Sequence, residues 1–195
     1  MNLLSYGISK LGRWSRRIDS LNTLLSVEDL PGDRWRVRDE MTWRANAYPN
    51  HGEGEIFERV VKHGGYIAWR SFEKKNSDSG AWIAIIPYAS VQDATLGVPT
   101  NSSDFIRNPN FHGEAGEEKQ VDGYQLPGTE SSAFFEKSVT SEDKSFTNKF
   151  VSGNVNNVVF VVAFTASDDG LPWGEMISIT TKQVDKIKEH SNIFE

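Results

Sequence analysis

The side chains best suited to catalysis are scattered along this chain of 195 residues. The four histidines show no H-x-H or H-x-x-x-H spacing, so no local metal-ligand motif exists among His51, His63, His112 and His190. The sequence also contains no cysteine, no G-x-S-x-G motif, no P-loop and no G-x-G-x-x-G motif. We therefore predict no catalytic residue, no metal site and no cofactor, and a hydrolase is the least favoured function.

Carboxylates occur in pairs, as glycosidases require, at Asp39-Glu40, Glu53 with Glu55, Glu117-Glu118 and Asp168-Asp169. Most of these pairs fall in predicted loops or at helix starts, where solvation and capping explain them. Asp39 differs because it falls on the apolar face of a predicted strand, and a buried carboxylate needs a partner. We take Arg70 as its candidate partner and favour a structural ion pair over a catalytic or ligand-gripping role.

Aromatic residues offer a more promising site than the titratable ones. Six of them lie in or beside one predicted sheet: Trp43, Tyr66, Trp69, Trp82, Tyr88 and Trp173. Core packing is the default role for this set, and the alternative is that part of it lines an apolar pocket with a few polar groups for orientation. For that pocket, the residues predicted to bind a ligand are Trp43, Trp69, Arg70 and Trp82.

A hairpin between residues 64 and 90 is expected to position these side chains. Two aromatic-rich runs, Tyr66–Phe72 and Ala81–Tyr88, flank a polar loop, which is the pattern of paired strands. Residues 33–44 alternate between bulky apolar and charged side chains, as a half-buried strand does. On this alternation Trp35, Val37, Met41 and Trp43 share one face with Asp39.

The rest of the chain predicts further hairpins and three more helices. Strands are expected at 119–126 paired with 131–139 and at 145–151 paired with 157–165, with a turn at Ser152-Gly153-Asn154 and with Val158–Phe164 the most buried. Helices are expected at 55–63, at 90–96 and at 171–190, with a long loop over 97–118. The fold class is α+β: a largely antiparallel sheet of about seven strands, with N-terminal, internal and C-terminal helices packed on it.

Residues 1–25 form an amphipathic helix in this prediction, and residues 26–195 form a single domain. Apolar residues recur every three or four positions along the segment, which carries four basic residues and one acidic residue. Such a helix docks on its own domain or on a second subunit, as in a homodimer. The alternative is a membrane surface, which would make the chain a peripheral membrane or assembly protein.

The overall charge narrows the class of partner. A formal net charge of −6 argues against a general nucleic-acid binder, which usually needs a basic face. The N-terminal region lacks the uninterrupted apolar stretch of a signal peptide, and no run approaches the roughly 20 apolar residues of a membrane span. These features predict a cytoplasmic location.

A pattern of short segments resembles a group of uncharacterised actinobacterial proteins. It consists of Asp29-Leu30-Pro31-Gly32, Trp35, Trp43-Arg44, Ala68–Phe72, Asn157–Val161 and Leu171-Pro172-Trp173. More distantly, the layout is similar to the sensor-like ligand-binding domains of actinobacterial lipoproteins and receptor kinases, and to PsbP-like α+β domains. The resemblance implies a non-enzymatic binding or sensor-like domain for a small apolar or amphipathic molecule or a protein partner.

Overall fold

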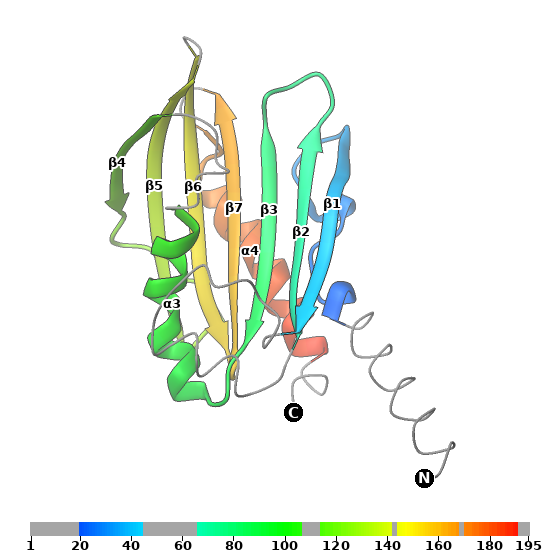
Figure 1. Ribbon diagram of the computed structural model, residues 1–195, viewed down its shortest axis with the longest axis vertical. Helices are drawn as coiled ribbons and strands as arrows, with labels where there is room; N and C mark the ends of the chain where they lie inside the picture. Colours follow the sequence, from blue (N-terminus) through cyan, green and yellow to red (C-terminus); the bar gives the residue numbers. More distant parts are fainter. Residues whose placement is uncertain (1–19, 45–65, 107–113, 142–143, 168–169, 191–195) are drawn as a thin grey trace.

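The computed structural model describes residues 20–44, 66–106, 114–141, 144–167 and 170–190. Within them, seven strands form one sheet in the order β1-β2-β3-β7-β6-β5-β4, and every neighbouring pair is antiparallel (Figure 1). The strands are β1 (Trp35–Arg44), β2 (Tyr66–Lys74), β3 (Gly80–Pro87), β4 (Glu114–Gln120), β5 (Ser131–Ser141), β6 (Lys144–Val155) and β7 (Val158–Ser167).

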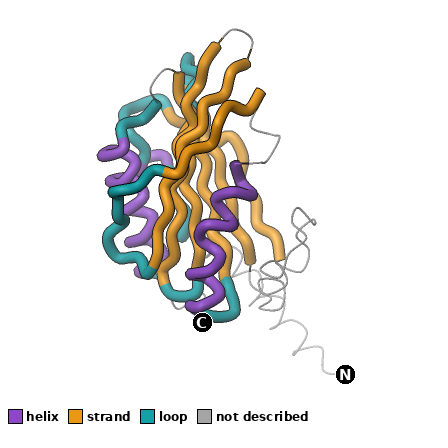
Figure 2. Tube along the Cα trace, turned by 90° about the vertical axis from the view of Figure 1, so that its left-hand side faces the viewer, coloured by secondary structure: helices purple, strands orange, loops and turns teal. Residues whose placement is uncertain are grey.

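Helices cover both faces of this sheet. One face carries α3 (Val91–Ile106), and the other carries α4 (Trp173–Glu189) together with the short 3-10 helix η1 (Val27–Asp29). Figure 2 shows the two long helices on opposite sides of the strands. The predicted α+β fold with a largely antiparallel sheet of about seven strands is confirmed.

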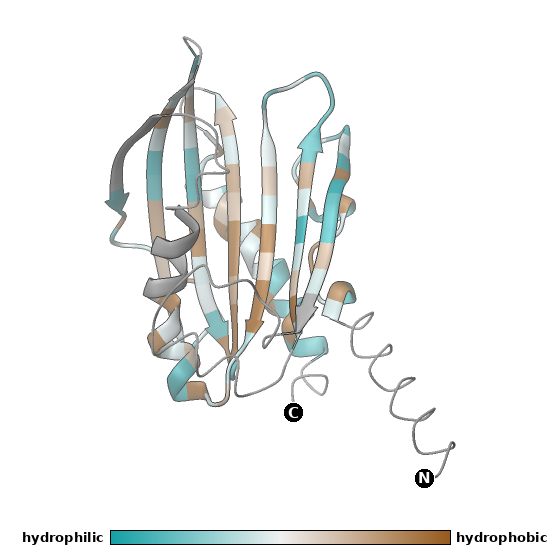
Figure 3. Cartoon of the chain, viewed as in Figure 1, coloured by the Kyte–Doolittle hydropathy of each residue, from teal (hydrophilic) through white to brown (hydrophobic). Residues whose placement is uncertain are grey.

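Two hydrophobic cores follow from this three-layer arrangement, because alternate residues of a strand point to opposite faces. On the α4 face, Phe160, Val162 and Phe164 of β7 pack with residues of the helix; on the α3 face, Val159 and Val161 pack with Ala94 and Val98. Figure 3 shows hydrophobic colouring along β3 and β7 at the centre and a hydrophilic stretch in β1 at the edge. The segment Val158–Phe164 is buried throughout, as predicted.

A β-bulge divides β1 into two halves that face opposite sides of the sheet. The pairing with β2 shifts between Val37 and Asp39. Trp35, before the bulge, lies on the α4 face, whereas Met41, after it, pairs with Trp69 on the α3 face. The prediction of one shared face was therefore wrong, because a single extra residue reverses the alternation.

Residues 97–118 were predicted to form a loop and instead hold most of a helix and a strand. α3 starts as expected, with the Ser90 hydroxyl accepting a hydrogen bond from the Asp93 N–H at 3.1 Å. It continues past Gly97 and Pro99 because Ala94 and Val98 are fully buried against the sheet, and packing outweighs local propensity. β4 then begins at Glu114, five residues before the predicted strand.

The turn between β6 and β7 lies at Asn156-Asn157, whereas the predicted turn residues are paired inside β6. Asn156 takes the positive φ of 51° that this tight connection requires. The sequence predicts Gly153 in a turn, but packing is what requires a glycine here. A Cβ at this position would lie 2.8 Å from Cζ of Phe160.

Several predictions fall outside the described residues. They concern most of the 1–25 helix, the 55–63 helix, His51, His63, His112 and the Asp168-Asp169 pair. Over the described ranges, no helix is long and apolar enough to cross a membrane. The same ranges contain no group of three or more histidine, cysteine or acidic residues suited to a metal ion.

Candidate functional site

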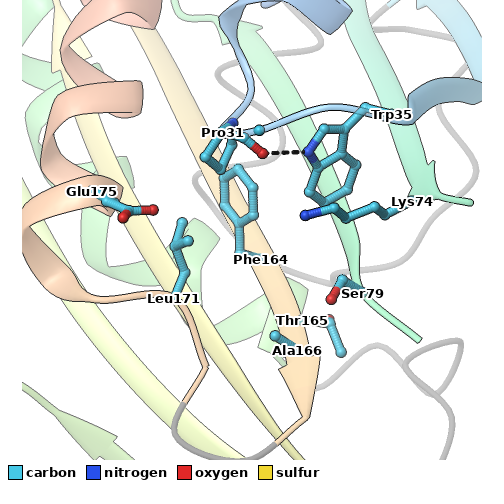
Figure 4. Close-up of a pocket in the computed structure, with 10 residues that line it drawn as sticks. Pro31, Trp35, Lys74, Ser79, Phe164, Thr165, Ala166, Leu171 and Glu175 are labelled. Carbon is cyan, nitrogen blue, oxygen red and sulfur yellow. Dashed lines mark hydrogen bonds between the residues drawn. The ribbon is translucent and has the colours of Figure 1, made fainter. Parts of the chain in front are cut away.

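A pocket of about 320 Å³ opens on the α4 face, beside the β2–β3 hairpin loop (Figure 4). Four separate parts of the chain build it: the loop after η1 with the first residue of β1, the ends of β2 and its hairpin loop, the end of β7, and the start of α4. The lining residues are Pro31, Gly32, Trp35, Lys74, Ser79, Phe164, Thr165, Ala166, Leu171 and Glu175. Antiparallel pairing brings these parts together, since Trp35 is opposite Lys74 and Gly80 is opposite Thr165.

Two aromatic rings make the apolar wall. Trp35 and Phe164 meet edge to face, with ring centroids 6.0 Å apart and an interplanar angle of 89°. The indole Nε1–H of Trp35 donates a hydrogen bond to the carbonyl of Pro31 at 2.8 Å, which fixes the ring and the loop together. Both rings are buried below 10% exposure, so this wall is formed before any ligand arrives.

Charged groups stand on opposite sides of that wall. Lys74 Nζ lies 5.6 Å from the centroid of the Trp35 ring, and Glu175 occupies the first turn of α4. Figure 4 shows the amine of Lys74 and the carboxylate of Glu175 extending toward Phe164 from opposite sides, with Ser79 below the amine. Within the described part of the chain, neither Lys74 nor Glu175 forms an ion pair.

The tryptophans predicted to bind a ligand lie elsewhere. Trp69 and Trp82 are on the α3 face, on the opposite side of the sheet from the pocket. Trp82 is buried and meets Phe150 edge to face at 6.4 Å, so it packs in the core. Trp43 pairs with Ile67 in the β1–β2 register, and its side chain is outside the described part. Whether these three residues bind a ligand stays a prediction.

Arg70 is not brought together with the three tryptophans. It lies on the α4 face, where its Nε and Nη2 contact Glu40 at 2.9 and 2.8 Å and its Nη1 donates to the carbonyl of Leu25 at 2.9 Å. The predicted partnership with Asp39 is wrong, because the bulge turns Asp39 to the other face and places Glu40 opposite Arg70. Asp39 is exposed and needs no buried partner.

Sequence reasoning missed the pocket itself. Trp35, Lys74, Phe164 and Glu175 are separated by 140 residues from first to last, and each has an ordinary role in its own element. The available signal was the pairing of the strand starting at Trp35 with the strand ending at Lys74, which places a ring beside an amine. No local sequence pattern indicates that the start of α4 lies beside the end of β7.

No protein-family model matches this sequence, and no curated protein sequence matches it. Solved structures, in contrast, match its fold. The extracellular domain of PknH from Mycobacterium tuberculosis superimposes with a TM-score of 0.57 and 13% sequence identity, covering 89% of this chain and 96% of that one. An uncharacterised protein from Mycobacterium smegmatis, the Rv0999 ortholog, gives a TM-score of 0.47 and 6% identity over 86% of this chain and 96% of that one.

The PknH comparison supports the resemblance in its coarse form: the chain has the fold of a mycobacterial extracellular domain. It also overturns the predicted cytoplasmic location, because the PknH structure that this chain matches is an extracellular domain. That prediction rested on the absence of a signal-peptide pattern, and such an absence does not identify a compartment.

Proposed function

We propose that this protein is a non-enzymatic, sensor-like binding domain that holds a small amphipathic molecule in the pocket beside Trp35. The observation that carries the proposal is a pre-formed aromatic wall with an amine and a carboxylate at its edges, neither of which forms an ion pair with another described residue. Binding sites for small molecules usually combine an apolar lining with a few well-placed polar groups. At about 320 Å³ the pocket suits a molecule of fragment size.

Three features favour binding over catalysis at this site. As far as the structure describes it, the lining contains a single carboxylate and a single amine and no histidine, and the sequence has no cysteine. The hydroxyl of Thr165 is engaged with Asn148, and Ser79 accepts a hydrogen bond from Ser77 at 2.9 Å rather than facing a base. A nucleophile needs a neighbouring base to activate it, and these contacts supply none.

The test is an NMR titration with 1-hexanol, a neutral amphipathic probe, followed at the indole N–H of Trp35. We expect saturable shifts at Trp35 and at the backbone of Leu171. Ala166→Leu adds apolar volume inside the pocket and should abolish these shifts. Thr140→Leu, at an exposed position of β5, is the matched control and should leave them unchanged.

Two results would contradict the proposal. One is the absence of any saturable shift in the wild-type protein, with 1-hexanol or with a charged analogue of the same length. The other is binding that survives Ala166→Leu, which would place the probe outside the pocket.

A further inference from the structure

Lys74 and Glu175 carry opposite charges into the same pocket without neutralising each other. Among the described residues that line the pocket, Lys74 is the only base and Glu175 the only acid. Figure 4 places the apolar side chains of Phe164 and Leu171 between them. A ligand that spans the pocket therefore meets an ammonium at one end, a carboxylate at the other and an apolar surface in the middle.

We infer that the pocket binds a zwitterionic molecule whose carboxylate and ammonium groups are joined by a short apolar chain, such as an ω-amino acid or a small peptide. This inference rests on the proposed function and specifies its ligand class. The ligand carboxylate accepts from Lys74 Nζ, and the ligand ammonium donates to the Glu175 carboxylate. Hydrogen bonds between charged partners are stronger than neutral ones and fix the direction in which a ligand lies.

The Lys74 end is built to receive a carboxylate. Its amine is held against the face of Trp35, 5.6 Å from the ring centroid, and the backbone N–H of Lys74 bonds to the carbonyl of Ser79 at 3.1 Å. The Ser79 hydroxyl accepts from Ser77 at 2.9 Å, and no hydrogen bond among the described residues uses its own hydrogen, which can donate to an acceptor in the pocket. The ammonium and the hydroxyl, which lies below it in Figure 4, are the two donors that a ligand carboxylate can use at this end.

The Glu175 end is suited to an ammonium. Glu175 is in the first turn of α4, at the positive end of the helix dipole. The described residues give this carboxylate no basic partner, although α4 carries Lys182, Lys186 and Lys188 further along. Lys182 and Lys186 contact Asp29 instead, so the Glu175 carboxylate can accept a hydrogen bond from a ligand.

Four six-carbon probes test the inference by NMR titration: 6-aminohexanoate, hexanoate, hexylamine and 1-hexanol. We expect 6-aminohexanoate to bind at least fivefold more tightly than any of the other three. Lys74→Gln should lower its affinity to that of hexylamine, and Glu175→Gln should lower it to that of hexanoate. Lys75→Gln and Glu189→Gln, at exposed neighbouring or same-helix positions, are matched controls and should leave all four affinities unchanged.

The outcomes separate the inference from the proposed function. If 1-hexanol binds and 6-aminohexanoate binds no more tightly, the ligand class is wrong and the binding function stands. An affinity for 6-aminohexanoate that survives both charge variants also overturns the ligand class. If no probe binds, both proposals fail.

Discussion

At the scale of single residues, Asp29 connects η1 to the C-terminal helix. Its carboxylate accepts from the backbone N–H of Ser26 at 2.8 Å and from the Ser26 hydroxyl at 2.9 Å, and it lies 3.2 Å from Nζ of Lys186. Burial on its own raises the pKa of Asp29, but these hydrogen bonds and the lysine charge outweigh burial and lower that pKa below its ordinary value.

The lowered pKa gives a pH-dependent prediction. A carboxyl group with a depressed pKa in the folded state stabilises the fold fully above its unfolded pKa of about 4 and loses that contribution as pH falls through the folded pKa. Asp29→Asn should cost about 1 kcal/mol of unfolding free energy at pH 7, with the difference from wild type shrinking below pH 4. Urea denaturation at several pH values measures it. Asp185→Asn, at an exposed position of α4, is the control, and a difference independent of pH would contradict the assignment.

Two glycines make a matched test of packing. A Cβ at Gly153 would lie 2.8 Å from Phe160 Cζ and 3.1 Å from the carbonyl oxygen of Ser131, whereas a Cβ at Gly174 would meet nothing within 4 Å. Gly153→Ala should therefore lower the free energy of unfolding by about 1–3 kcal/mol through overpacking. Gly174→Ala, inside α4, should raise it by about 0.5–1 kcal/mol through helix propensity. Urea denaturation of both variants measures the two changes in unfolding free energy. Equal changes would argue against this packing account of Gly153.

At the scale of elements, one glutamine attaches the segment before η1 to α4. The Gln183 side chain is fully buried, donates to the carbonyl of Thr23 at 2.7 Å and accepts from the N–H of Leu25 at 3.0 Å. Arg70 holds the same segment from the sheet through the carbonyl of Leu25. This attachment matters to the pocket because the same segment continues to Pro31 and Gly32 in the pocket wall.

Removing the Gln183 side chain should therefore destabilise the protein more than an ordinary polar substitution. Gln183→Ala leaves a buried carbonyl and a buried N–H without partners, which costs about 2–4 kcal/mol of unfolding free energy. Thermal or urea denaturation measures the loss. Gln125→Ala, at an exposed loop position, is the control and should change stability by less than about 0.5 kcal/mol. Equal stability of the two variants would contradict a structural role for Gln183.

At the scale of the whole molecule, the described strands and helices follow the predicted order, and the sheet is antiparallel throughout. This much was predictable because apolar runs rich in β-branched and aromatic residues, such as Val158–Phe164, are typical of buried strands. The errors occurred where long-range contacts overrule local signals. α3 continues through Pro99 because it packs against the sheet. Only a glycine fits at position 153 because the ring of Phe160 is so close. One extra residue in β1 turns Asp39 away from Arg70.

The candidate site was less predictable than the fold, and for a physical reason. Its apolar wall comes from Trp35 and Phe164, which lie in strands that are not neighbours, and its charges come from the end of β2 and the start of α4. No local pattern links such residues. The aromatic residues chosen from the sequence, Trp69 and Trp82, lie on the other face of the same sheet.

The most direct test of the central claim is to locate a bound molecule by nuclear Overhauser effects. In a complex with 1-hexanol, we predict contacts from the methylene protons of the probe to the ring of Phe164, the ring of Trp35 and the methyl groups of Leu171. Contacts to Trp69 and Met41 on the α3 face, with none to Phe164, would contradict the account.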